Sequence, residues 1–452
     1  MDPELTKYYN RPLPRYTSYP TAPHFTAEIG EQRYRRWLGG IDAATPVSLY
    51  LHIPFCQELC WFCGCNTRVV RDATIIAQYR DRLIREIDLV ADAIPGRLTV
   101  NQIHFGGGSP NTLEAASFAG LLDHLRQRFE VSRDAEVAIE IDPRSVTRDF
   151  IVTCAEAGVT RASLGVQDLN PTVQQAINRI QPYNVVARVA DELRAAGIAD
   201  VNVDLMYGLP HQTVTVLLAT VEKILRFAPS RIALFGYAHV PWLKPHQKLI
   251  DEDALPDNIE RWRQFEATAE RLASLGYAPV GMDHFARPDT RLAQAGATDA
   301  LHRNFQGYTT DDAPALLGLG ASSIGMLTEG YVQNTPDVRQ WAAAVDAGAL
   351  PTARGIALDD DDRLRRAVIE RLMCDLTVDL DETARRFGND ADYFAKEIGT
   401  LVPLQNDGVV SIEGPVIRVA PRNRLLIRTV AAAFDRYAMK SAAATPRHST
   451  AV

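Results

Sequence analysis

The sequence predicts an α/β protein built on a partial barrel of six βα units, preceded by an N-terminal strap and followed by a small, mostly helical domain. Six short runs rich in apolar and β-branched residues alternate with longer segments of helical period. Consecutive βα units imply a parallel sheet with right-handed crossovers, and hence a barrel or partial barrel. The composition, with 46% apolar and 23% charged residues among 452, is that of an ordinary soluble globular protein.

The strands of the predicted barrel are bounded by polar segments and by Gly or Pro. They are the runs 47–53 (VSLYLHI), 98–105 (LTVNQIHF), 136–142 (EVAIEID), 161–166 (RASLGV), 201–206 (VNVDLM) and 231–235 (RIALF). Between the first two runs, apolar residues from Ile76 to Ile94 recur at spacings of three and four, which predicts a helix with one apolar face. Later helical segments end at Gly158 and Gly197, where glycine favours the left-handed cap conformation.

The chain is predicted to contain four parts. A strap covers residues 1–40, the barrel with an extension of its substrate pocket covers 41–354, a C-terminal domain covers 355–440, and 441–452 form a loose tail. In the C-terminal domain we expect helices over 359–374, 381–387, 393–401 and about 422–437, with a hairpin over 409–419. This outline resembles a winged helix, but the acidity of the chain argues against DNA reading and favours a packing or lid role.

The charge balance excludes several classes of partner. There are 48 Lys and Arg against 56 Asp and Glu, a formal net charge of -8, so no global basic field attracts nucleic acid or an anionic membrane. The apolar runs are too short to span a bilayer, and the polar, Pro-rich N-terminus lacks the apolar run of a signal peptide. We therefore expect a cytoplasmic protein without nucleic-acid or membrane partners, in which any anionic ligand is held by a local cluster of Arg or Lys.

Polar groups follow each predicted strand. A cysteine loop follows the first strand, GGGSPNT the second, Glu140 and Asp142 close the third, Gln167 and Asp168 follow the fourth, Asp204 ends the fifth, and Tyr237 to His239 follow the sixth. In βα barrels the loops at the carboxyl ends of the strands build the active site, so these groups should converge on one face.

The cysteine loop carries the most specific pattern. Cys56, Cys60, Cys63 and Cys65 fall inside ten residues, which is too dense for a disulfide framework in a large chain. A structural zinc site commonly uses two separated CxxC pairs and closes its coordination sphere. Three thiolates in a CxxxCxxC loop can instead hold three irons of a 4Fe-4S cluster and leave the fourth iron open to an external ligand. We favour the cluster, with zinc as the alternative.

Residues 106–110, GGGSP, form a tight turn on the plainest interpretation. After the second strand of such a barrel, absent side chains and free backbone N–H groups would also let a cofactor approach closely. Glu140, Gln167, Arg179 and Asp204 could each be solvated surface groups, or could pair with polar groups of that cofactor at the barrel mouth.

The cysteine spacing and the glycine motif resemble the radical S-adenosylmethionine superfamily, and the likeness to one family covers nearly the whole chain. The segments RYTSYP (15–20), YLHIPFCQELCWFCGCN (50–66), IHFGGGSP (103–110), IEIDPR (139–144), LGVQD (164–168), DLMYGLP (204–210), GMDHFARP (281–288) and HRNFQGYTT (302–310) are similar to the oxygen-independent coproporphyrinogen III oxidases, also called coproporphyrinogen dehydrogenases. The departures are small, with Trp61 where a Tyr is familiar and Ser109 where a Thr is.

The resemblance implies the roles of individual residues. Cys56, Cys60 and Cys63 would bind a 4Fe-4S cluster, and Cys65 would sit beside it without binding iron. A first S-adenosylmethionine would contact Tyr50, Gly107, Glu140 and Ile324. A second S-adenosylmethionine would contact Phe62, Gly108, Ser109, Gln167, Arg179, Asp204 and Ala238.

The resemblance also implies the reaction. A 5'-deoxyadenosyl radical takes hydrogen from the β-carbon of a propionate, and loss of carbon dioxide and one further electron leaves a vinyl group. Two such events convert coproporphyrinogen III to protoporphyrinogen IX in heme biosynthesis. The implied partners are that substrate and an electron donor such as flavodoxin or ferredoxin, and the protein would act as a monomer.

The substrate carries four carboxylates although the chain is acidic, so forked arginine contacts are needed locally. Arg15, Arg287 and Arg303 are the candidates, because each lies inside a segment typical of the family. The segment RYTSYP is either a strap packed on the barrel surface or part of the pocket, and we favour the second interpretation.

Two other functions of the same superfamily remain as alternatives. A heme chaperone would bind tetrapyrrole without decarboxylating it, and a heme-opening methyltransferase would use the radical differently. The chaperone relatives lack RYTSYP, GMDHFARP and HRNFQGYTT, which favours the oxidase.

Overall fold

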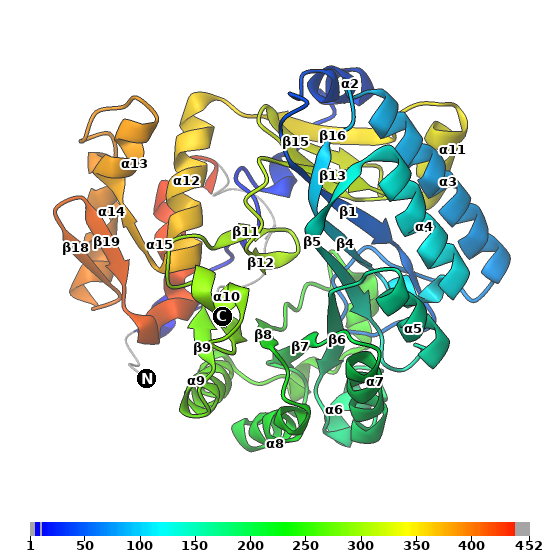
Figure 1. Ribbon diagram of the computed structural model, residues 1–452. Coiled ribbons are helices and arrows are strands. Elements are labelled where there is room, and N and C mark those ends of the chain that lie inside the picture. Colours follow the sequence, from blue (N-terminus) through cyan, green and yellow to red (C-terminus); the bar gives the residue numbers. More distant parts are fainter. Residues whose placement is uncertain (1–4, 10, 439–452) are drawn as a thin grey trace.

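The computed structural model describes residues 5–9 and 11–438, so the predicted tail lies outside the described residues. A twelve-stranded sheet forms the framework, in the order β16-β15-β14-β13-β1-β4-β5-β6-β7-β8-β10-β9 (Figure 1). The six predicted strands lie consecutively in it. They are β1 (Val47–Ile53), β4 (Thr99–Gly107), β5 (Glu130–Ile141), β6 (Arg161–Gln167), β7 (Asp200–Tyr207) and β8 (Arg231–Gly236).

The parallel part of the sheet has one strand more than the sequence predicts. β13 (Ala315–Leu319) pairs in parallel with β1, from Val47 opposite Ala315 to Leu51 opposite Leu319. β14 (Ile324–Leu327), β15 (Gly330–Asn334) and β16 (Thr352–Ala357) continue from it in antiparallel fashion, while β10 (His284–Ala286) and β9 (Ala278–Val280) extend the other edge. The predicted partial barrel is confirmed and has an antiparallel extension on each side.

Helices cover the outer face of the curved sheet (Figure 1). They are α3 (Ala73–Asp92), α4 (Ala115–Arg128), α5 (Arg148–Glu156), α6 (Pro171–Ala176), α7 (Tyr183–Ala195), α8 (Val214–Ile224) and α9 (Asn258–Ser274). Several start at a polar cap whose side chain accepts backbone N–H groups, as Asp72 does from Thr74 and Thr147 from Phe150. The apolar faces of these helices pack on strands such as β1, six of whose seven residues are buried.

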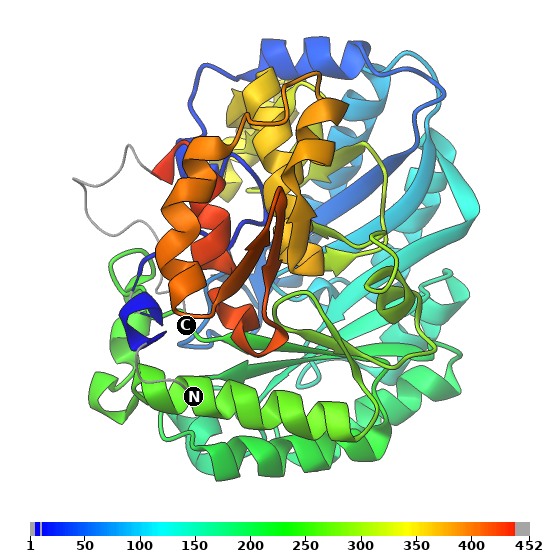
Figure 2. The ribbon, with the colours of Figure 1, turned by 90° about the vertical axis from the view of Figure 1, so that its left-hand side faces the viewer.

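The C-terminal domain packs beside the barrel, and its elements lie at the front in Figure 2. It comprises α12 (Asp360–Asp375), β17 (Thr377–Asp379), α13 (Leu380–Arg386), α14 (Ala395–Asn406), β18 (Val410–Glu413) and β19 (Val416–Val419), with the sheet order β17-β19-β18.

The last predicted helix is not continuous. It consists of the 3-10 turn η7 (Pro421–Leu426), the short helix α15 (Ile427–Ala431) and the 3-10 turn η8 (Ala432–Phe434). It ends at Asp435, whose carboxylate accepts the backbone N–H groups of Tyr437 and Ala438 and so replaces further helical bonds.

The N-terminal segment is held from several sides. Tyr9, in α1 (Thr6–Tyr9), stacks on Trp262 of α9 with ring centroids 4.9 Å apart, and a backbone bridge joins Thr26 to Gly355 of β16. Tyr16 and Tyr19 are buried against the C-terminal domain, where they contact Asp435 and Arg436. Within the described residues, no helix has both the length and the apolar character that crossing a membrane requires.

Candidate active site

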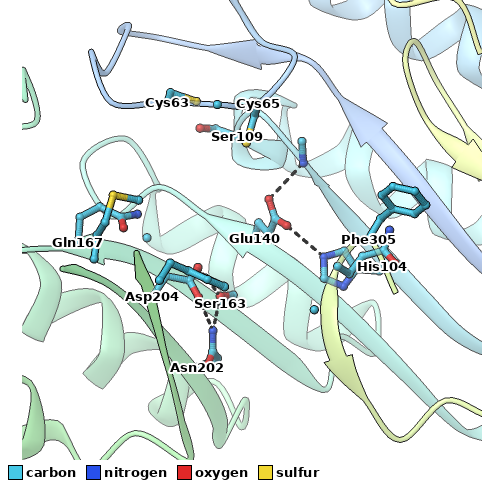
Figure 3. Close-up of a pocket in the computed structure, with 18 of the residues that line it drawn as sticks. Cys63, Cys65, His104, Ser109, Glu140, Ser163, Gln167, Asn202, Asp204 and Phe305 are labelled. Atoms are coloured by element: carbon cyan, nitrogen blue, oxygen red, sulfur yellow. Dashed lines mark hydrogen bonds and ion pairs between the residues drawn. The ribbon is translucent and has the colours of Figure 1, made fainter. Parts of the chain in front are cut away.

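A cavity of about 610 Å³ opens at the carboxyl ends of the parallel strands. It brings together most of the residues that the sequence analysis singles out, several of which Figure 3 shows pointing into the same space. The predicted residues that line it are Arg15, Cys56, Cys60, Phe62, Cys63, Cys65, Gly107, Gly108, Ser109, Glu140, Gln167, Arg179, Asp204, Ala238 and Arg303.

The cysteine loop is held in place through its backbone carbonyls. The segment after β8 supplies three donors, with His246 Nε2 2.8 Å from the Cys63 oxygen, Lys244 Nζ 2.9 Å from that of Cys65, and Gln247 Nε2 3.0 Å from that of Phe62. On the opposite side, Asn178 Nδ2 donates to the Leu59 oxygen at 2.8 Å. Since these bonds use main-chain oxygens, they leave the cysteine sulfurs facing the cavity.

Two guanidinium groups lie against the sulfur of Cys60. Arg179 Nη1 is 3.4 Å and Arg144 Nη2 3.5 Å from Cys60 Sγ, and both arginines also bind the carboxylate of Asp142. Burial alone would raise the pKa of Asp142, but the two arginines outweigh it and lower that pKa. The pair therefore provides positive charge beside a thiol that would have to act as a thiolate.

The other thiols differ in their surroundings. Ser109 Oγ donates to Cys56 Sγ at 3.7 Å, and burial raises the pKa of the Cys56 thiol to about 11. The hydrogen bond from the Cys65 thiol lowers the pKa of Cys63 to about 6 and raises that of Cys65. Within this pair Cys63 is thus the more readily ionised thiol.

The glycine motif is required by close packing. A Cβ atom on Gly108 would lie 2.5 Å from the Phe55 carbonyl oxygen, and one on Gly107, at φ +111°, would lie 2.5 Å from the His52 ring. The expectation of free N–H groups is wrong. The amide of Gly107 donates to Glu140 Oε2 at 3.1 Å, that of Gly108 to the Ile53 oxygen at 2.8 Å, and that of Ser109 to the Phe55 oxygen at 2.7 Å. The glycines therefore matter because they let the Phe55 backbone and the His52 ring pack closely against this turn.

Glu140 stands in the middle of the cavity, between the cysteine loop and His104 (Figure 3). His104 Nε2 lies 3.3 Å from Glu140 Oε1, and the Gly107 amide binds the other carboxylate oxygen. Burial alone would raise the pKa of Glu140, but these two partners outweigh it and lower the pKa. Glu140 can accordingly present an ionised carboxylate to a cationic amino group.

Asp204 belongs to a polar network on the adjoining strands (Figure 3). Ser163 Oγ donates to one carboxylate oxygen at 3.0 Å and Asn202 Nδ2 to the other at 2.8 Å. Nearby, Gln167 has a left-handed backbone at φ +68°, and its buried Oε1 has no hydrogen-bond partner. An unsatisfied buried acceptor at a cavity wall fits a ligand that donates a hydrogen bond.

Two arginines meet at the far wall of the cavity. Arg15 Nη2 donates to the Gly236 oxygen at 3.0 Å, and Arg303 Nη2 lies 3.4 Å from the backbone oxygen of Arg15. The Arg303 guanidinium stacks over the Tyr308 ring, 4.5 Å from its centroid, and its buried Nε and Nη1 have no hydrogen-bond partner. These free donors fit an anionic group in the cavity.

The structure does not bring Arg287 to this site. Its side chain is 43% exposed and binds Asp289 at 3.0 Å, while its backbone N–H donates to Ser230, just before β8. Antiparallel pairing of β10 with β8 places the residue after β10 beyond the amino end of β8, and Arg287 is not among the residues that line the cavity. The structure therefore places Arg287 outside the cavity, and we do not assign it to the substrate.

Tyr50 and Ile324 are not among the residues that line the cavity. The Tyr50 hydroxyl donates to His52 Nδ1 at 3.0 Å, because His52 Nε2 carries the proton that binds the Asn66 oxygen. Ile324, in β14, packs on the same small apolar cluster as Phe305, which lines the cavity.

The residues present fit an iron–sulfur cluster better than a single ion. No three His, Cys, Asp or Glu side chains within 5–9 and 11–438 are arranged to hold one metal ion. In a 4Fe-4S cluster each thiolate binds a different iron, so the sulfurs line a shared space and do not converge on one point. Cys56, Cys60 and Cys63 line the cavity in this way, with arginines beside Cys60.

Sequence reasoning missed several cavity residues. His104, Ser163 and Asn202 lie on strands with their side chains toward the cavity, and Phe305 lies on the loop between β11 (His302–Asn304) and β12 (Gly307–Thr309). His104, Ser163 and Asn202 could have been found in the sequence, because each is a polar residue inside an otherwise apolar strand. The signal for Lys244 and Gln247 is weaker, since they act through a loop whose path depends on tertiary contacts.

Two family models match parts of the chain. The radical SAM superfamily matches residues 50–224, and the HemN C-terminal domain matches residues 358–426.

The chain is similar over nearly its whole length to proteins named as coproporphyrinogen III oxidases. An oxygen-independent coproporphyrinogen III oxidase of Bradyrhizobium diazoefficiens is 50% identical over 430 residues, covering 95% of this chain and 96% of the relative. One from Escherichia coli is 40% identical over 442 residues, covering 98% and 96%. A solved structure, described as coproporphyrinogen III oxidase (HemN) from Escherichia coli, a radical SAM enzyme, superposes with a TM-score of 0.91 at 40% identity and covers 96% of this chain and 99% of that one.

Proposed function

The chain belongs to the family of oxygen-independent coproporphyrinogen III oxidases, and from that premise we propose that its cavity is where two propionates of coproporphyrinogen III are decarboxylated to vinyl groups. The observation that carries the proposal is that one cavity is lined both by the CxxxCxxC thiols and by Arg15 and Arg303. Radical chemistry and carboxylate binding can then occur in the same enclosed space.

The protein is a radical SAM oxidoreductase that uses a 4Fe-4S cluster and S-adenosylmethionine. When bound, these cofactors supply a 5'-deoxyadenosyl radical that takes a hydrogen atom from the substrate. We assign Cys56, Cys60 and Cys63 as the cluster ligands, with Arg179 and Arg144 stabilising the charge on Cys60. Cys65, which lines the same cavity, is assigned a place beside the cluster without binding iron.

The first S-adenosylmethionine is assigned to the space around Glu140. The ionised carboxylate would accept a hydrogen bond from the amino group, and the methionyl chain would lie in the cavity beside Gly107. Tyr50 would support this region from β1 and Ile324 would close the apolar side.

The second S-adenosylmethionine is assigned to the opposite part of the cavity. The unpartnered Oε1 of Gln167 and the carboxylate of Asp204 would accept its hydroxyl or amino hydrogens. The residues assigned to this molecule are Phe62, Gly108, Ser109, Gln167, Arg179, Asp204 and Ala238.

Substrate carboxylates are assigned to Arg15 and Arg303. Removal of one hydrogen atom, one carboxylate as carbon dioxide and one electron converts a propionate to a vinyl group. Because the reacting carboxylate leaves as carbon dioxide, we assign the arginines to the propionates that are not reacting. The electron that reduces the cluster would come from a small donor protein such as a flavodoxin or ferredoxin. The enzyme would act as a monomer in the cytoplasm.

The test is anaerobic incubation of the reconstituted protein with coproporphyrinogen III, S-adenosylmethionine and a reductant, followed by mass analysis of the tetrapyrrole. We expect two successive losses of carbon dioxide with two hydrogens, ending at protoporphyrinogen IX. Tetrapyrrole binding without any mass change would contradict the proposal and favour a heme chaperone.

A further inference from the structure

We propose that Arg428 of the C-terminal domain is a positioning residue that fixes Arg15 in the substrate cavity by holding the strap backbone. The inference rests on the proposed function, since it concerns how the same cavity binds the carboxylates of its tetrapyrrole. It gives the C-terminal domain a part in substrate affinity, although none of its described residues, up to Ala438, lines the cavity.

The contact is between one guanidinium and two successive carbonyls of the strap. Arg428 is 4% exposed, its Nε donates to the Pro14 oxygen at 2.8 Å, and its Nη2 donates to the Leu13 oxygen. The next residue is Arg15, whose accessible side chain reaches the cavity. Because a guanidinium is planar and rigid, binding two adjacent peptide oxygens fixes the direction in which the chain enters Arg15.

Two further contacts fix the residues that follow. Arg303 Nη2 lies 3.4 Å from the Arg15 oxygen, and the Tyr16 hydroxyl donates to Asp435 Oδ2 at 3.1 Å. Tyr16 has a left-handed backbone at φ +47°, which a residue with a side chain adopts only where its surroundings impose it. No regular secondary structure spans residues 13–19, so these contacts replace the backbone bonds that a strand or helix would supply.

The same region carries an excess of positive charge. Burial lowers the pKa of Arg428 to about 9, and the nearby charges of Arg15 and Arg303 add to the effect. The carboxylate of Asp283 acts on both Arg15 and Arg303, but it is also bound to His284 Nδ1 at 2.8 Å. An anionic ligand would relieve this repulsion, whereas holding three arginines together without one requires the strap to be fixed.

The experiment is a double-mutant cycle on the full-length holoprotein, with coproporphyrin III as the probe. This stable porphyrin has the same four carboxylates, and its fluorescence reports binding. We expect Arg15→Ala and Arg428→Gln each to weaken binding by about tenfold or more, and the double variant to be little weaker than Arg15→Ala alone. Additive losses, or an Arg428→Gln variant that binds as wild type does, would overturn the proposal.

Three further variants distinguish a positioning role of Arg428 from an effect of its charge and from a general loss of stability. Arg428→Lys keeps the charge but cannot donate to both carbonyls in one plane, so it should not restore binding, and full rescue would contradict the mechanism. Tyr16→Phe removes only the hydroxyl bond to Asp435, so it should fold and weaken binding in an Arg15-dependent way. Arg418→Gln breaks an exposed ion pair with Glu413 inside the C-terminal domain and should bind porphyrin normally.

The cycle also distinguishes this inference from the proposed function. A wild-type protein that decarboxylates coproporphyrinogen III but shows no coupling between Arg15 and Arg428 refutes only the positioning role. Coupling in a protein that binds coproporphyrin III without decarboxylating coproporphyrinogen III refutes only the proposed reaction.

Discussion

Arg179 Nη1 lies 3.4 Å from the sulfur of Cys60 and also reaches the carboxylate of Asp142. The arrangement joins the cysteine loop after β1 to the ends of β5 and β6, which lie two and three strands away in the sheet. A cation at this position stabilises a thiolate and links the orientation of the loop to the barrel mouth.

The first prediction concerns the cluster ligands. Replacing Cys56, Cys60 or Cys63 with Ala should remove most of the iron and the visible absorbance, while far-UV circular dichroism stays unchanged because the buried barrel strands do not depend on the loop. Cys65→Ala is the matched control, since the same loop loses a thiol that is not assigned as a ligand. Full iron content in Cys60→Ala, or an equal loss in Cys65→Ala, would show that the assignment is wrong.

The second prediction concerns space at the glycine motif. Gly108→Ala places a Cβ atom 2.5 Å from the Phe55 carbonyl oxygen, so the backbone beside Cys56 must shift. We expect a loss of about 1–3 kcal/mol in stability and weaker binding of S-adenosylmethionine, measured by thermal unfolding and equilibrium dialysis. Gly120→Ala, in α4 with nothing within 4 Å, should gain roughly 0.5–1 kcal/mol.

The third prediction separates the arginines. Arg303→Ala removes free donors from the cavity wall and should raise the KM for coproporphyrinogen III by about tenfold or more, with the iron content unchanged. Arg287→Ala should leave kcat and KM within about twofold of wild type, because its side chain binds Asp289 away from the cavity. A large defect in the second variant and none in the first would reverse the assignment.

The fourth prediction concerns acid stability. Burial would raise the pKa of Glu136, but ion pairs with Arg161 and Arg231 outweigh it and lower the pKa to about 2. Because the pKa is lower in the folded state, the stabilisation is present above the unfolded value near 4.5 and is lost as pH falls toward about 2.

Glu136→Gln should therefore cost up to roughly 3 kcal/mol at pH 7, and its difference from wild type should shrink between about pH 4.5 and pH 2. Urea unfolding at several pH values measures this. Glu382→Gln, which breaks an exposed pair with Arg386, should leave the pH dependence unchanged. A constant difference for Glu136→Gln across that range would rule out the pKa shift.

The barrel was predictable because its strands are buried on both faces. The predicted runs match β1, β6, β7 and β8 to within about one residue at each end, since continuous apolar runs between polar breaks define them. The short strands from β9 to β16 were missed because three to six residues give too little periodicity, and their pairing depends on segments far apart in the sequence.

The residues of the candidate site were predictable where they lie at the carboxyl end of a parallel strand. Glu140 and Asp204 follow from the rule that carboxyl ends of parallel strands share one edge, and the cavity brings both together. Arg287 was misplaced because its segment reverses direction between β9 and β10, so that an antiparallel strand carries it beyond the amino end of β8. The direction of a strand relative to its neighbours depends on tertiary contacts, and the residues of GMDHFARP do not determine it locally.

The contact between Arg428 and the carbonyls of Leu13 and Pro14 also sets an order of events during synthesis. A ribosome adds residues from the N-terminus, so the strap emerges more than four hundred positions before the side chain that holds it. The parallel strands, from β1 to β13, and the cysteine loop with its donors Lys244, His246 and Gln247 are complete by Leu319, so they can fold and take up iron while the mouth is still open. Closure of the tetrapyrrole pocket then becomes the final step, so a nascent or prematurely terminated chain would carry a cluster before it could bind the carboxylates of its substrate.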